Sequence, residues 1–154
     1  MSLFSCQIRL CSASLIGGLL AVTPVYAAPS CSFRSVSSVS FGAYDVFSTL
    51  ANNNGVGSLS IKCTGGANSV VSLSAGQSNN FANRVMRSGV NLLNYNLYTS
   101  TAHALVWGDG SGGSRVISPG NNGTITLNIF GQIPAGQDAA VGIYTDNITL
   151  TVSF

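Results

Sequence analysis

The chain has 154 residues, which is enough for one domain and too few for a multidomain enzyme. Hydrophobic residues make up 45% and charged residues 6% of the chain, and the formal net charge is +2. This composition excludes charge-driven disorder and provides no basic stripe that could bind a nucleic-acid backbone.

The first 27 residues are predicted to be an export signal peptide. Arg9 supplies a positive charge, and the apolar run from Leu10 to Val22 is too short to span the ~30 Å hydrocarbon core of a membrane. Pro24 ends this run, and Val25-Tyr26-Ala27 has the small-x-small pattern of a cleavage site. We therefore expect cleavage after Ala27, a mature domain over residues 28–154 without a membrane span, and export through the inner membrane.

Two cysteines, Cys31 and Cys63, remain after this cleavage, because Cys6 and Cys11 are lost with the signal peptide. In an exported protein such a pair is expected to form a disulfide. Closing a loop of about 32 residues stabilises the fold by roughly 3 to 4 kcal/mol in the chain-entropy model. The chain has a single histidine, so no zinc site can be assembled around the cysteines.

The mature chain is predicted to be all-β. Apolar and polar residues alternate with a period of two over residues 39–41, 58–63, 71–74, 93–98, 124–129 and 147–154. Clusters of Gly and Asn, which favour turns, separate these runs at 52–55, 65–66, 108–113 and 120–123. About seven short strands and one cystine are typical of a two-sheet immunoglobulin-like sandwich.

Residues capable of catalysis are few. His103 has no acidic neighbour in the sequence, and the four Asp residues lie beside turn-forming residues, where a turn role is the better interpretation. The Gly108-x-Gly110-x-x-Gly113 pattern is not followed by a helix, so it does not predict nucleotide binding. We expect no catalytic residue, no cofactor and no metal site, and interpret the protein as not an enzyme.

Seven segments resemble, in their order, the spore coat protein U domain family, and the resemblance covers Cys31 to Phe154. They are Phe41–Asp45, Ser60–Thr64, Arg84–Met86, Leu93–Tyr98, Val106–Gly110, Phe130–Gln137 and Gly142–Asp146.

The resemblance implies a secreted bacterial subunit of an archaic chaperone-usher pilus, or of a related spore or cell coat. Such subunits are similar to immunoglobulin folds that lack their last strand. A periplasmic chaperone and then a neighbouring pilin subunit donate the missing strand, and an outer-membrane usher assembles the fibre at the cell surface. A groove for that strand is expected beside the final strand of this chain. Its expected lining residues are Ile148, Leu150, Val152 and Phe154, whose alternative role is ordinary core packing.

The segment Ala28-Pro29-Ser30 spans only about 10 Å before Cys31, too short to serve as a donor strand. This suggests an acceptor-only subunit at the fibre tip, with a role in cell adhesion and biofilm formation; a shaft or coat subunit is the alternative. Phe47 and Phe81 lie in polar loops and are the candidate adhesive aromatics. A self-contained carbohydrate-binding module and, more remotely, a secreted hydrolase are the competing function classes.

Overall fold

The fold seen in a computed structural model is all-β over the residues it describes, 27–120 and 122–154. The predicted signal peptide lies almost wholly outside this range, so its cleavage remains a prediction. The strands are β1 (Ser30–Ser40), β2 (Asn52–Thr64), β3 (Ser69–Leu73), β4 (Arg84–Ser88), β5 (Asn91–Tyr98), β6 (Ile117–Gly120), β7 (Gly123–Ile133) and β8 (Leu150–Ser153). One 3-10 turn, Gly76–Ser78, is the sole helical element in the described part of the chain.

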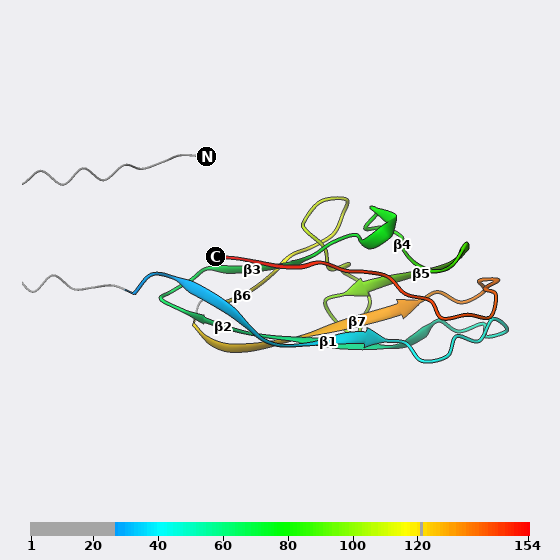
Figure 1. The fold of residues 1–154 in the computed structure, drawn as a ribbon, viewed down its shortest axis with the longest axis horizontal. Coiled ribbons are helices and arrows are strands. Elements are labelled where there is room, and N and C mark those ends of the chain that lie inside the picture. Colours follow the sequence, from blue (N-terminus) through cyan, green and yellow to red (C-terminus); the bar gives the residue numbers. More distant parts are fainter. Residues whose placement is uncertain (1–26, 121) are drawn as a thin grey trace, which may run out of the picture.

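The strands form two sheets, as the sequence predicted. A five-stranded sheet has the order β1-β2-β7-β5-β4, and a three-stranded sheet has the order β6-β3-β8. All named strand pairs are antiparallel. β1, β2 and β7 lie in one layer, and β3 with the C-terminal segment lies in the other (Figure 1). The expected immunoglobulin-like sandwich is confirmed.

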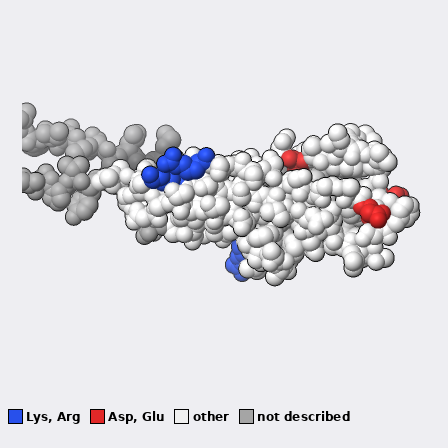
Figure 2. Space-filling view, turned by 90° about the horizontal axis from the view of Figure 1, so that it is seen from below, with Lys and Arg blue, Asp and Glu red and all other residues white. Residues whose placement is uncertain are grey.

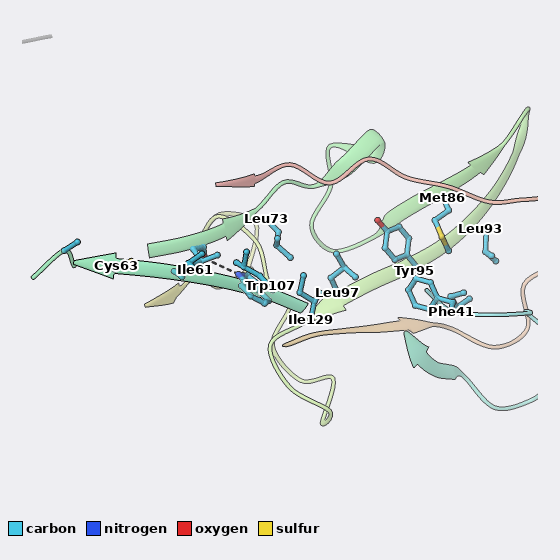
Figure 3. Close-up of a cluster of buried hydrophobic side chains, with 14 residues drawn as sticks. Phe41, Ile61, Cys63, Leu73, Met86, Leu93, Tyr95, Leu97, Trp107 and Ile129 are labelled. Atoms are coloured by element: carbon cyan, nitrogen blue, oxygen red, sulfur yellow. Dashed lines mark hydrogen bonds between the residues drawn. The ribbon is translucent and has the colours of Figure 1, made fainter. Parts of the chain in front are cut away.

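The core fills the space between the two layers, because each strand turns its apolar residues inward at every second position. Leu59, Ile61 and Cys63 of β2 are fully buried, and Val71 and Leu73 of β3 belong to the same core cluster. Figure 3 shows Ile61 and Cys63 in the layer opposite Leu73. Trp107 is also fully buried, and its Nε1 donates a hydrogen bond to the carbonyl of Val71 at 3.1 Å. The indole therefore stabilises the core through both packing and a satisfied polar group.

The predicted disulfide is confirmed. Cys31 and Cys63 are bonded, and they are directly opposite each other in the β1–β2 pair. The bond thus fixes the first strand to the sheet near its beginning.

The turn predicted at residues 52–55 is wrong, because these residues belong to β2, with a register irregularity between Asn52 and Gly55. Two observations explain the difference. Asn52 Nδ2 donates hydrogen bonds to the carbonyls of Phe41 and Ala43, both at 3.1 Å. Gly55 lies under the Phe41 ring, where a Cβ atom would overlap the ring. The glycine is therefore needed for a close approach within the sheet, and not for a turn.

The final strand is shorter than predicted. Residues 147–154 alternate as expected, yet β8 covers only Leu150–Ser153. Before it, the chain is held by side chains: Asn147 N donates to the Asp146 carboxylate, and Thr149 N donates to Ser74 Oγ. These contacts replace a regular ladder, so Ile148 precedes the strand and Phe154 follows it.

Candidate strand-binding groove

The inner side of β1 is not covered by the second sheet. Residues directly opposite each other in an antiparallel pair project from the same face. Phe33 is opposite Ile61 and Val36 is opposite Leu59, and both β2 partners are fully buried. Phe33 and Val36 therefore point toward the interior, yet they remain 53% and 60% exposed.

The facing edge, at β8, is also incompletely covered. Leu150 and Val152 are opposite the buried Leu73 and Val71, so both point inward, where they are half-buried. Phe154 continues the same alternation and is 58% exposed. β1 and β8 are both edge strands, each with one neighbour in its sheet. Two open edges thus border the same space, and Val36 lines it; Phe33 and Phe154 project inward from the same two edges.

Two adjoining cavities, of about 490 and 630 Å³, occupy this space. The first lies between residues 36–39 and 144–150, and Leu73, Leu97 and Ile129 line it from the core. The second lies between residues 39–47 and 139–144, over Met86, Leu93 and Ile133. Both cavities include Val39, Phe41, Met86 and Tyr144, so they form one continuous channel. We call this channel the groove; Figure 3 shows several of the core residues along its floor.

An extended peptide fits the chemistry of the groove. The floor is largely apolar and can accept alternate side chains, whereas the two flanking edges offer main-chain hydrogen-bonding groups. Adding one strand would cover the exposed inward faces of β1 and β8 together.

The C-terminal edge of the groove is fixed by main-chain bonds to β4 and to the chain after β3. Arg87 N donates to Thr145 O at 2.8 Å, and Thr145 N donates to Arg87 O at 3.0 Å. Ser74 N donates to Thr149 O at 2.9 Å. These bonds hold residues 145–149 in place although they form no regular strand.

Asp146 and Tyr95 form a hydrogen-bonded polar pair in the wall of the first cavity. The Tyr95 hydroxyl donates to Asp146 Oδ2 at 2.8 Å, and the backbone N–H groups of Gln77 and Asn147 donate to Oδ1 at 3.0 and 2.7 Å. Burial, and then the hydrogen bond to Asp146, raise the pKa of Tyr95 well above its ordinary value. The phenol is therefore a neutral donor at physiological pH.

A fully buried arginine supports the sheet beneath the groove. Arg84 donates to the carbonyl oxygens of Ser74 and Trp107 and to Asn96 Oδ1, at 2.7 to 3.1 Å. Burial lowers the pKa of Arg84 from its ordinary value, but the guanidinium stays charged. This role was not predicted from the sequence; an arginine at an inward position of an alternating strand was the available signal.

The predicted groove residues differ in their positions. Ile148 and Leu150 line the first cavity, and Val152 packs partly against the core. Phe154 lies beyond the two cavities, at the exposed end of the edge. Phe33 and Val36 were not predicted, because bulges in β1 interrupt their alternation.

The two predicted adhesive aromatics have different surroundings. Phe47 is 91% exposed, and its N–H donates to Asp45 Oδ1 in a turn. Phe81 is half-buried; its ring centroid lies 5.3 Å from Arg84 Cζ, and the ring packs against Gly108. Phe47 is thus available for contact, whereas the ring of Phe81 is engaged in packing.

Phe47 belongs to an apolar cluster at one end of the sandwich. The β1–β2 loop, the β4–β5 hairpin and the segment after β7 meet at this end (Figure 1). Each carries strongly exposed apolar side chains, which are Phe47, Leu50, Val90, Val141 and Ile143. We call this set the loop-end cluster. Charged groups are sparse on the face shown in Figure 2, as the composition predicts.

No group of three or more metal-ligating residues was found within residues 27–120 and 122–154. His103 packs edge-on against Tyr98, with ring centroids 5.1 Å apart. In the same part of the chain, no helix has the length and hydrophobicity needed to cross a membrane.

Comparison with known proteins identifies one protein family. The family profile described as Spore Coat Protein U domain matches residues 17–151. A protein named Protein U from Myxococcus xanthus is 30% identical over 128 residues, which are 75% of this chain and 71% of that protein.

A solved structure shares the fold. It is the CsuC–CsuE chaperone–tip adhesion subunit pre-assembly complex from the archaic chaperone-usher Csu pili of Acinetobacter baumannii. The match has a TM-score of 0.58 and 22% identity, and it covers 82% of this chain but 40% of the chain in that complex.

Proposed function

The chain belongs to the Spore Coat Protein U domain family, and from this premise we propose that it is a secreted structural subunit of a surface fibre or coat, assembled by donor-strand exchange. The groove is the site that accepts the donated strand. One observation carries this proposal: Phe33, Val36 and Phe154 project toward the interior from two open sheet edges, and more than half of each side chain is left exposed by the described chain. A strand from a partner would both cover these side chains and form main-chain hydrogen bonds with the open edges.

The proposed partners follow from the same need. A periplasmic chaperone fills the groove while the subunit is in transit, an outer-membrane usher assembles the fibre, and a neighbouring subunit then replaces the chaperone strand. The solved structure that shares the fold is a pre-assembly complex of a chaperone with a tip adhesion subunit, which supports the chaperone as a partner. In the absence of a partner, the exposed apolar edges would favour aggregation.

A self-complemented chain tests the proposal. A twelve-residue strand with alternating aliphatic residues is added after Phe154 through a short turn, so that it can fold back beside β8. We expect a soluble monomer with a higher melting temperature than the unmodified chain. The control carries the same residues in an order that removes the alternation. If the unmodified chain is equally stable and monomeric, the sandwich is complete, and a self-contained binding module becomes the better interpretation.

The loop-end cluster supports a finer proposal, that the subunit attaches to apolar surfaces at the fibre tip. Phe47 projects from a turn that Asp45 fixes, so its ring can contact a surface at little entropic cost. Phe47→Ser should reduce attachment of cells to polystyrene without reducing export. Phe81→Ser should instead lower the stability of the subunit, because that ring packs on Arg84. Unchanged attachment by the exported Phe47 variant would contradict the adhesive role.

The tip position also depends on the start of the mature chain. Cleavage after Ala27 leaves three residues before Cys31, and N-terminal sequencing of the exported protein should therefore begin at Ala28. A start before about residue 20 would restore a longer arm and remove this argument for an acceptor-only subunit.

A further inference from the structure

The floor of the groove has an apolar–polar–apolar order along β5. Leu93, Tyr95 and Leu97 are successive inward-facing residues of this strand, and all three are buried. At about 3.4 Å per residue, Leu93 and Leu97 lie about 14 Å apart, with Tyr95 midway between them. A strand above the groove also presents a side chain at every second residue. Three successive inward side chains of that strand therefore meet Leu97, Tyr95 and Leu93 in turn.

The polar pair at the middle position has an unused hydrogen-bonding site. A carboxylate offers about four lone-pair sites, two on each oxygen. Asp146 Oδ1 accepts from the N–H groups of Gln77 and Asn147, so its sites are used. Within the described residues, Asp146 Oδ2 accepts one hydrogen bond, from the Tyr95 hydroxyl. One lone pair on Oδ2 is left, and Asp146 lines the groove.

The Asp146 carboxylate is held in place by packing. It is pressed against the backbone of Gly76, where a Cβ atom would overlap the carboxylate. On the other side, the Tyr95 ring is packed edge to face against Phe41, with centroids 5.7 Å apart. A strand that fills the groove thus meets a fixed acceptor beside a fixed aromatic pair.

We propose, on the basis of the function proposed above, that the strand accepted by this groove carries Ser or Thr opposite the Tyr95–Asp146 pair. Large aliphatic residues occupy the positions two before and two after it. The hydroxyl donates to Asp146 Oδ2, and the flanking side chains enter the two cavities. An aliphatic residue at the middle position would remove the remaining lone pair of a charged oxygen from water without supplying a second donor, which is unfavourable.

Four self-complemented chains test this inference, because Thr and Val have nearly the same shape. One pair places Thr or Val opposite Tyr95–Asp146, and a matched pair makes the same exchange at the flanking position opposite Leu97. Equilibrium unfolding in urea measures the folding equilibrium constant of each chain. We expect Thr to be favoured about tenfold or more at the middle position, as for a hydrogen bond to a charged group. Val should be favoured at the flanking position.

Two variants of the acceptor site identify the cause of the preference. Asp146→Asn removes the charge and should reduce the preference for Thr several-fold. Tyr95→Phe frees a second lone pair on Oδ2, so the preference should persist or increase.

Each result has a distinct meaning. If Val equals or exceeds Thr at the middle position while both strands stabilise the chain, the inference is wrong and the groove stands. The inference is also wrong if the Asp146→Asn variant folds and keeps the full preference for Thr over Val at the middle position. If neither strand stabilises the chain, the proposed function itself fails.

Discussion

The two exposed valines of adjacent strands provide a direct test of which face the partner covers. Val36 in β1 and Val56 in β2 are 60% and 55% exposed. Val36 is opposite the buried Leu59 and points into the groove, whereas Val56 is opposite the exposed Ser40 on the outer face. The two residues therefore match in type and exposure but differ in the face they occupy.

The expected magnitude follows from the area that a strand would cover. Val→Ala removes two methylene equivalents, worth about 1.6 kcal/mol when fully buried. With 60% of Val36 exposed, Val36→Ala should cost only about 0.6 kcal/mol in the open groove. Filling the groove buries the rest, so the same change should cost about 1 kcal/mol more, a fivefold change in the equilibrium. Val56→Ala should cost the same in both states.

The assay is urea unfolding of four variant chains, Val36→Ala and Val56→Ala, each with and without the added strand. The quantity of interest is the difference between the filled and open states, which cancels any change in intrinsic strand propensity. An equal difference for the two valines would refute the assignment of the inner face of β1 to the groove.

Three further predictions concern the scaffold of the groove. Arg84→Met should lower the free energy of unfolding by about 3 to 5 kcal/mol, because the buried oxygen atoms that accept hydrogen bonds from Arg84 lose their donor. The control, Arg87→Met on the exposed face of β4, should change it by less than about 0.5 kcal/mol. Urea unfolding measures both variants. Reduction of the Cys31–Cys63 bond should lower the same quantity by about 3 to 4 kcal/mol, measured with and without dithiothreitol. The pKa of Tyr95 in the folded chain is raised above its ordinary value of 10.0. The neutral phenol therefore stabilises the fold fully below pH 10, and this stabilisation is lost as the pH rises above 10. Tyr95→Phe should reduce this alkaline loss in a series of melting temperatures.

The sequence predicted the fold class and the disulfide because both depend on local patterns. The alternation of Ile125, Leu127 and Ile129 places these residues on one face, as observed in β7. The Cys31–Cys63 bond needed only an exported chain and two remaining cysteines. These features do not depend on which strands are neighbours.

The groove was predicted only on one side, because its other side depends on register. The approximate position of the C-terminal edge followed from the alternation of Leu150 and Val152. The β1 edge did not, since bulges between Phe33 and Ser35 and between Ser37 and Ser40 break the period of two. A bulge moves later residues to the other face, so counting along the sequence gives the wrong orientation.

The roles of the loop aromatics were also beyond local patterns. Phe47 and Phe81 lie in similar polar surroundings in the sequence. They differ because Gly108, distant along the chain from Phe81, packs against the Phe81 ring, which also lies over Arg84. Tertiary contacts of this kind decide which exposed-looking aromatic is free.

Hydrogen–deuterium exchange of the self-complemented chain tests the central claim most directly. The open edges on either side of the groove are residues 36–40 of β1 and the segment 145–153. The account predicts that an added alternating strand slows amide exchange in both segments, relative to the chain with the scrambled strand, because a pairing strand supplies new main-chain partners. The outer strand β6, at the far edge of its sheet, should show much smaller changes. Unchanged exchange at both groove edges, with the strand present and the chain folded, would contradict the claim that this groove accepts a donated strand.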